Sequence, residues 1–198
     1  MQRLPKNFTQ DLYGNKMLLD FSTTVAEEEV ESYYQHYYEY TSIFKMTTIK
    51  KCLKKDSKGS GGKTDGLIEC NYKGKFFYGI QETKYKLPDT ELQLKKQLVQ
   101  PMMYDWIFER KGFYYDTQFY MLTSEKYVSV IYSEEIEEFK RKLWNVYPVI
   151  TESPCNAYKN PLVRKIMDET NIDFRKQLIT DKFKLHEVVR DIFKHCLK

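Results

Sequence analysis

The sequence is poor in the residues that bind transition metals or cross-link small secreted domains. Its three histidines show no His-Glu-x-x-His spacing, and its four cysteines form no Cys-x-x-Cys pair. We therefore expect neither a zinc knuckle nor an iron–sulfur cluster. Reduced, mostly buried thiols in a cytoplasmic protein are expected at Cys52, Cys70, Cys155 and Cys196.

The chain also lacks any run of about 18 apolar residues, so we expect no membrane span. Its first residues, MQRLPKNFTQDLYG, have no apolar core typical of a signal peptide. Hydrophobic residues nevertheless make up 41% of the chain and aromatic residues 16%. This content is far above that of a disordered chain, and 198 residues can bury a real core. We expect one domain spanning residues 1–198.

Charge is unevenly distributed, although the formal net charge is only +4. Between Lys45 and Lys63 there are seven lysines and one acidic residue, Asp56. Such a run is usually a solvated face. Beside an acidic hydrolytic site, it would instead suit a polyanionic substrate.

Hydrophobic periodicity and turn residues predict an α/β (α+β) protein with a mixed β-sheet flanked by helices. Strands are expected at 44–54, at 65–70 and 75–86 around an Asn-Tyr-Lys-Gly turn, and twice within 117–133. Helices are expected at 22–40, from about 90 to 112, at 134–146 and at the C-terminus, with a loop over 147–161. Pro101 should kink or interrupt the second helix.

The segment Gly62-Lys63-Thr64 matches the end of a phosphate-binding Walker A loop. The first glycine of that motif would fall at position 57, which is Ser57. A strand, not a helix, is expected after Thr64, so no helix N-terminus would meet a phosphate. We therefore interpret this segment as part of a basic loop rather than as an NTPase motif.

Two carboxylates are expected to lie close together, at the start of the strand at 65–70 and near the end of the strand at 75–86. Asp65 precedes the first strand, and Glu82 and Lys84 share one face near the end of the second. Phe76, Tyr78 and Ile80 continue that face, so it should run from an apolar interior to a charged end. Two adjacent carboxylates repel each other, and Mg²⁺ or Mn²⁺ would relieve the repulsion. The spacing is also compatible with a charged hairpin held by a cross-strand salt bridge.

Asp65, within Thr-Asp-Gly, and Glu82-x-Lys84 resemble the motif of the PD-(D/E)XK nuclease superfamily. The predicted order of helix, three strands, helix and strand over residues 22–132 is similar to its core. The resemblance implies a restriction endonuclease-like fold (αβββαβ), with residues 133–198 as a C-terminal helical extension. It implies metal ligation by Asp65, Glu82 and Thr83, and catalysis by Asp65, Glu82, Lys84 and a first-helix acid, Glu27. Glu28, Glu29 and Glu31 are alternatives to Glu27.

The segment Gln-Pro-Met-Met-Tyr, residues 100–104, resembles the Gln-x-x-x-Tyr motif of RecB-like members of that superfamily. Gln100 and Tyr104 lie on one helical face, and Gln93 and Gln97 extend it. In the family these groups help to hold the site and the nucleic-acid strand. An exposed glutamine and a packed tyrosine are the ordinary alternative, and Pro101 is atypical of the motif.

The sequence thus predicts a Mg²⁺- or Mn²⁺-dependent deoxyribonuclease that uses a metal-activated water. Endonuclease activity is favoured over exonuclease activity, and cutting of both strands at one place would favour a homodimer. The alternative is a catalytically inactive nucleic-acid-binding or assembly subunit with the same fold. The residues expected to bind DNA are Lys54, Lys55, Lys58, Lys63, Lys95, Lys96, Gln100 and Tyr104.

Overall fold

The computed structural model describes the protein in two levels of detail. The backbone alone is described for residues 8–10, 16–19, 45–49, 52–53, 62–63 and 182. Backbone and side chains are described for residues 27, 29–31, 33, 34, 64–110, 112–150, 152–180 and 183–198.

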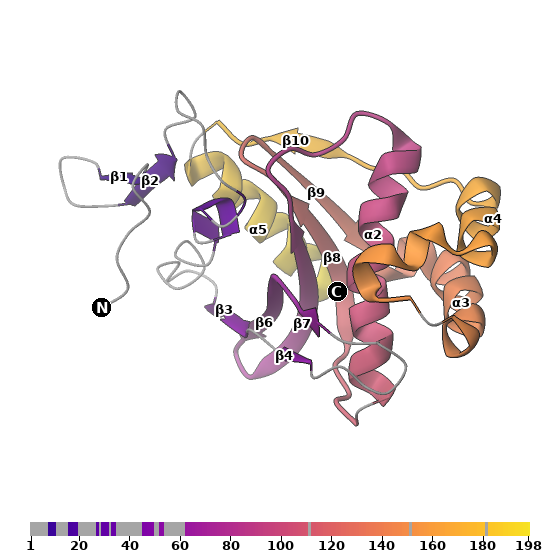
Figure 1. The fold of residues 1–198 in the computed structure, drawn as a ribbon. Coiled ribbons are helices and arrows are strands. Elements are labelled where there is room, and N and C mark those ends of the chain that lie inside the picture. Colours follow the sequence, from indigo (N-terminus) through magenta and orange to yellow (C-terminus); the bar gives the residue numbers. More distant parts are fainter. Residues whose placement is uncertain are drawn as a thin grey trace.

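Within these residues, the main β-sheet has six strands in the order β10-β9-β8-β7-β6-β3 (Figure 1). Neighbouring strands are antiparallel, except that β7 and β8 are parallel. The strands are β3 (Lys45–Ile49), β6 (Gly66–Tyr72), β7 (Lys75–Thr83), β8 (Thr117–Thr123), β9 (Tyr127–Tyr132) and β10 (Lys176–Leu178). Two further strand pairs are β1 (Phe8–Gln10) with β2 (Lys16–Leu19), and β4 (Cys52–Leu53) with β5 (Gly62–Lys63).

Helices cover both faces of this sheet. The α-helices are α2 (Glu91–Arg110), α3 (Glu137–Val146), α4 (Pro161–Glu169) and α5 (Lys182–Cys196). The 3₁₀ helices are η1 (Ser133–Ile136), η2 (Tyr147–Val149) and η3 (Pro154–Lys159). Residues 27, 29–31, 33 and 34 are also helical. Because α2 connects β7 to β8, those two strands can run parallel.

Side chains alternate along the strands and so divide the interior into two cores. On one side, Ile80, Tyr120 and Leu122 pack with residues of α2, α3 and α4. On the other side, Phe119 and Met121 pack with α5 and with the helical segment around residue 30. The result is a three-layer α/β/α arrangement, which Figure 1 shows with α2 and α5 on opposite faces of the strands.

The β6–β7 hairpin is closed by a two-residue turn at Lys73 and Gly74. Both residues have positive φ angles, 51° and 85°, as a type I′ turn requires. The Asn71 side chain accepts a hydrogen bond from the Gly74 N–H at 3.1 Å. The Asn-Tyr-Lys-Gly turn predicted from the sequence is confirmed, and it fixes the register of the hairpin.

Most predicted elements are present, with three differences. The helix that contains Pro101 runs without interruption from Glu91 to Arg110. The stretch 147–161 contains η2 and η3 instead of being irregular throughout, and β10 adds a sheet strand that the periodicity did not indicate. No helix in the described part of the chain has the length and apolarity needed to cross a bilayer.

Candidate active site

The register of the hairpin places Asp65 beside Glu82. Gly66 of β6 pairs with Gln81 of β7. Asp65 and Glu82 each lie one residue further from the hairpin turn, so they are neighbours across the two strands. The backbone N–H of Thr83 donates to Asp65 Oδ2 at 2.8 Å. The Asp65 carboxylate is therefore tied to the end of β7 by a main-chain hydrogen bond.

Glu82 is almost completely buried, with 1% of its surface exposed. Its Oε1 accepts a hydrogen bond from Lys84 Nζ at 2.5 Å. Its Oε2 is buried and has no hydrogen-bond partner among the described residues. A buried polar oxygen without a hydrogen-bond partner is costly, which marks this atom as one that a ligand could satisfy.

The exposure of side chains along the face of β7 that carries Glu82 is the reverse of that expected from the sequence. Phe76, predicted to lie at the apolar interior end, is 52% exposed because it follows the hairpin turn. Ile80 and Glu82 are buried instead, beneath α2. The acidic end of the strand is therefore the end that is better shielded from solvent.

This burial sets the protonation of the site. Burial raises the pKa of Glu82 to about 8, assisted by the charge of Asp65 and opposed by Lys84. Burial also raises the pKa of Asp65, against the Thr83 N–H and the charge of Lys84. For Lys84, burial alone would lower the pKa, but Glu82, Glu27 and Asp65 raise it above its ordinary value.

A helical turn carrying acidic residues approaches the same place. Glu27 Oε1 lies 3.7 Å from Lys84 Nζ, and about half of the Glu27 side chain is exposed. The negative charge of Glu31, one turn further along, acts on Asp65 more strongly than that of Glu27. Both acids therefore adjoin the pair, whereas Glu28 lies outside the described residues.

Thr83 contributes differently from the two acids, because its side chain points to the opposite face of β7. There its Oγ1 accepts a hydrogen bond from Gln81 Nε2 at 3.0 Å and contacts Thr123 Oγ1 at 3.0 Å. Its N–H is used by Asp65. The side-chain hydroxyl of Thr83 is thus engaged on that face, and metal ligation by Thr83 stays what the resemblance implies.

Gln100 and Tyr104, on α2, are brought to the same region. The Tyr104 hydroxyl is hydrogen-bonded to Gln100, and its pKa is raised by burial and by the charges of Glu82 and Asp65. Because α2 is continuous through Pro101, the two side chains keep their helical i, i+4 relationship.

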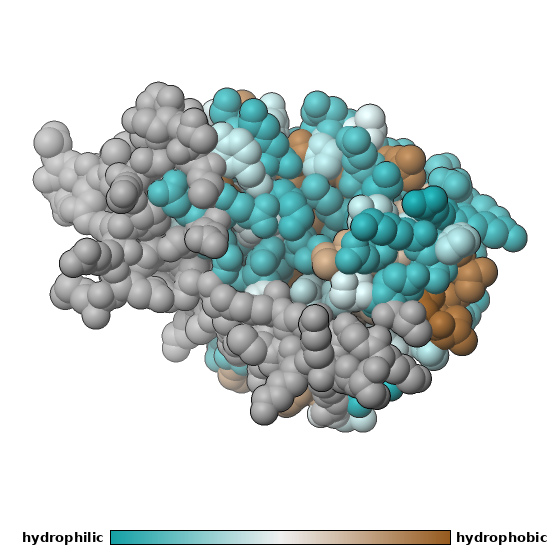
Figure 2. All heavy atoms as spheres, in the orientation of Figure 1, coloured by the Kyte–Doolittle hydropathy of each residue, from teal (hydrophilic) through white to brown (hydrophobic). Residues whose placement is uncertain are grey.

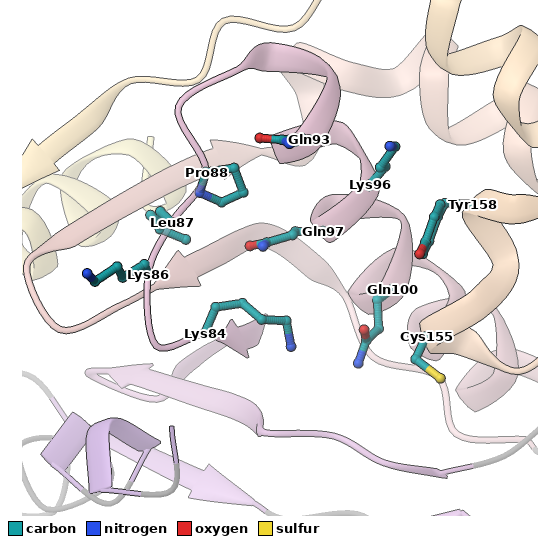
Figure 3. Close-up of a pocket in the computed structure, with 10 residues that line it drawn as sticks. All are labelled: Lys84, Lys86, Leu87, Pro88, Gln93, Lys96, Gln97, Gln100, Cys155 and Tyr158. Carbon is teal, nitrogen blue, oxygen red and sulfur yellow. The ribbon is translucent and has the colours of Figure 1, made fainter. Parts of the chain in front are cut away.

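Beside Lys84 opens a cavity of about 530 Å³ (Figure 3). Three parts of the chain form its walls: the β7–α2 connection, one face of α2, and η3. In Figure 3 the polar ends of Lys84 and Gln100 turn toward each other across it. Its lining residues are Lys84, Lys86, Leu87, Pro88, Gln93, Lys96, Gln97, Gln100, Cys155 and Tyr158. Sequence reasoning missed Cys155 and Tyr158, because they come from the stretch predicted to be a loop.

The lysines predicted to bind DNA have different outcomes. Lys96 lines the cavity, with its Nζ 5.6 Å from the centre of the Tyr158 ring. The prediction for Lys95 is wrong, since that side chain is 5% exposed and its Nζ binds Met167 O at 3.0 Å and Glu91 Oε1 at 2.7 Å. Outside the described side chains lie Lys54, Lys55, Lys58 and Lys63.

In the described part of the chain, no group of three or more His, Cys, Asp or Glu side chains is placed to hold a metal ion. A cation at this site would have the two carboxylates of Asp65 and Glu82 as its side-chain ligands. Mg²⁺ is commonly bound in proteins through one or two carboxylates, with several waters retained.

Comparisons of the chain with protein-family models, with curated proteins and with solved structures give no match. Its function is therefore inferred from the geometry of the site together with the sequence motifs.

Proposed function

We propose that the protein is a Mg²⁺- or Mn²⁺-dependent nuclease that hydrolyses phosphodiester bonds of DNA at Asp65, Glu82 and Lys84. The observation that carries this proposal is the state of Glu82. It is a buried acid, one oxygen of which binds Lys84 while the other has no partner among the described residues. A carboxylate kept for structure alone would be expected to have both oxygens satisfied.

The pair of acids fits a hard divalent cation. Both offer carboxylate oxygens, which Mg²⁺ and Mn²⁺ prefer, and they are adjacent on paired strands. When bound, such a cation would offset charge on the phosphate and lower the pKa of a water molecule. It would also require Glu82 to give up the proton that burial holds on it up to about pH 8.

Lys84 acts as a donor in this proposal. Its acidic neighbours raise its pKa, so the ammonium stays charged at neutral pH. It lines the cavity with 27% of its side chain exposed. It can therefore donate a hydrogen bond to a phosphate oxygen or orient a water molecule, while Glu82 and Glu27 hold it in place.

The order of elements supports the proposal. Helical residues near 30 are followed by β3, β6 and β7, then by α2 and β8. This is the αβββαβ order that the resemblance to PD-(D/E)XK nucleases implies for a restriction endonuclease-like fold. The aspartate and the Glu-x-Lys motif lie at one end of the β6–β7 hairpin, and Gln100 and Tyr104 lie on the following helix.

A polyanionic substrate suits the surface around the site. Lys84, Lys86 and Lys96 line the cavity, and none of the described residues that line it is acidic. Figure 2 shows that hydrophilic side chains dominate the face over α2 and the adjoining loops, with a smaller hydrophobic patch beside α3. DNA is the substrate class implied by the resemblance, and the phosphate backbone would meet these ammonium groups.

The test is cleavage of supercoiled plasmid, linear duplex, branched DNA and single strands, each with Mg²⁺, Mn²⁺ or EDTA. Wild type should be compared with Asp65→Ala, Glu82→Ala and Lys84→Ala. We expect metal-dependent cleavage that all three changes abolish without unfolding the protein, as judged by circular dichroism.

Two matched controls lie on the same hairpin. Glu69 contacts Tyr78 OH at 3.2 Å instead of the acid pair, and Lys73 is exposed at the turn. Glu69→Ala and Lys73→Ala should keep full activity. Cleavage that survives Glu82→Ala would refute the site, and binding of DNA without any cleavage would favour an inactive nucleic-acid-binding or assembly subunit.

A further inference from the structure

The cavity beside Lys84 is built from groups that recognise a nucleobase as well as a phosphate. Its floor and walls combine the apolar atoms of Leu87 and Pro88 with the aromatic ring of Tyr158. Lys84 and Lys96 supply ammonium groups at its polar side. Aromatic surface together with positive charge is the usual combination at sites that hold unpaired nucleotides.

Three glutamines supply hydrogen-bonding groups on one face of α2. Gln93, Gln97 and Gln100 recur at spacings of four and three residues, and all of them line the cavity. An amide can donate and accept at once, as the edge of a base does. The Oε1 atom of Gln97 is buried without a partner among the described residues, so a donor is missing at this wall.

The size of the cavity limits what can enter it. A volume of about 530 Å³ lies within the range of about 300–1,000 Å³ that is typical of small-molecule sites. One nucleotide is of that size, whereas a base pair within a duplex is not. A base can enter only when it is unpaired or has been turned out of the stack.

We propose that this cavity binds one unpaired nucleotide of the strand that is cut, and that single-stranded or tailed DNA is therefore preferred to fully paired, blunt DNA. The inference rests on the proposed function, because it requires a strand to lie across Asp65 and Glu82. Tyr158 and Gln97 would contact the base, and Lys96 would contact a phosphate. It assigns a substrate preference to residues outside the Gln-x-x-x-Tyr motif.

The first measurement is the ratio of kcat/KM for a duplex with a single-stranded tail to that for the same duplex with blunt ends. We expect a ratio of at least about ten in the wild type, because one stacked base is worth about that factor. Gln97→Leu and Tyr158→Ala should bring the ratio close to one, and Tyr158→Phe should restore it. The control variants Gln118→Leu and Tyr114→Ala, away from the cavity, should leave it unchanged.

The second measurement does not require cleavage. Cys155 lines the cavity and is exposed, whereas Cys70 is buried and Cys196 lies elsewhere. With Ca²⁺ in place of Mg²⁺, a tailed duplex should slow alkylation of Cys155 by iodoacetamide, as followed by mass spectrometry. A blunt duplex should not slow it, and alkylation of Cys196 should be unaffected by both.

The outcomes separate the two proposals. Cleavage with equal preference for blunt and tailed DNA, or without an effect of Gln97→Leu and Tyr158→Ala, overturns the nucleotide cavity alone. Protection of Cys155 by a tailed strand in a protein that cuts nothing upholds the cavity and overturns only the hydrolytic function. Neither cleavage nor protection overturns both.

Discussion

Glu82 and Asp105 are both buried acids on the α2 side of the sheet, but they are treated very differently. Asp105, on α2, is 5% exposed, and its two oxygens accept from Thr117 Oγ1 at 3.0 Å and Tyr120 OH at 2.6 Å. Lys140 Nζ adds an ion pair at 3.0 Å. Glu82 has one hydrogen bond, from Lys84, and an oxygen without a partner among the described residues.

This contrast indicates that Asp105 stabilises the fold, whereas Glu82 is available to bind a ligand. Burial of a charge is tolerable when donors surround it, and Asp105 has donors from β8 and from α3. Glu82 lacks that compensation and holds a proton instead, since burial raises its pKa to about 8. Substitutions at the two positions should therefore have opposite consequences for stability and activity.

The largest expected effect is the loss of cleavage in Glu82→Gln. The amide keeps the shape of the side chain but cannot become an anionic ligand, so kcat should fall by at least about a thousandfold. The free energy of unfolding should be unchanged at neutral pH, where burial already keeps Glu82 protonated, and higher above pH 8, where the amide replaces a buried anion. Single-turnover cleavage and urea denaturation measure the two quantities. Retained activity would show that Glu82 does not serve the chemistry.

Asp105→Asn should give the reverse result. Its partners Tyr120 and Lys140 would lose a charged acceptor in a buried place, so the free energy of unfolding should fall by about 3 kcal/mol. Cleavage per folded molecule should stay as in the wild type. Urea denaturation monitored by tryptophan fluorescence would show the change. The matched control is Asp89→Asn, because Asp89 is almost fully exposed and its ion pair with Lys176 should contribute less than about 1 kcal/mol.

The pH dependence of stability should reveal the Glu82 proton. The folded protein holds it up to about pH 8, whereas the unfolded chain releases it near pH 4.5. Unfolding therefore releases a proton between these values, and without metal the free energy of unfolding should fall as the pH rises from 5 to 8. Glu82→Gln should show a flatter profile.

Divalent metal should stabilise the folded protein more at high pH than at low pH, which is opposite to the effect of the Glu82 proton. Because the cation requires the ionised carboxylate, the increase in Tm on adding Mg²⁺ should be larger at pH 8.5 than at pH 6. Differential scanning calorimetry at matched ionic strength measures both effects. Identical pH profiles in wild type and Glu82→Gln would contradict the assignment of this proton.

The smallest expected effect is that of Tyr104→Phe. Its hydroxyl group is hydrogen-bonded to Gln100 and lies close enough to Glu82 and Asp65 to feel their charge. Removing it should lower kcat/KM by about three- to tenfold, as expected for one supporting hydrogen bond. Tyr147→Phe is the control, since its hydroxyl donates to Val99 O within the core at 3.4 Å. Equal effects of the two changes would assign Tyr104 to packing.

The sequence was sufficient for the parts of the site that are local along the chain. Asp65 and Glu82 come together because the two-residue turn at Lys73 and Gly74 fixes the pairing of β6 with β7. The alternation of side chains along a strand then places Glu82 and Lys84 on one face. Gln100 and Tyr104 share a helical face for the same kind of reason. The α/β class and most strands followed from short-range patterns.

Features that depend on contacts between distant segments were not predictable. Lys95 has the same local sequence surroundings as Lys96. However, α4 packs against α2, and the Lys95 ammonium therefore donates a hydrogen bond to Met167 O of α4. Tyr158 reaches the site because η3 folds back onto α2. The exposure of Phe76 and the burial of Glu82 depend on which end of β7 is covered, which alternation alone does not state.

Thr83 shows how one strand end can carry two independent sets of constraints. Toward Asp65 it offers a main-chain N–H, which every residue except proline possesses. Its side chain belongs to a polar cluster with Gln81 and Thr123 on the opposite face. Substitutions that repack the α5 side can therefore accumulate at this position during evolution without changing how the acid is held. Mutations in the core on the α5 side of the sheet should therefore leave the geometry of Asp65 and Glu82 unchanged.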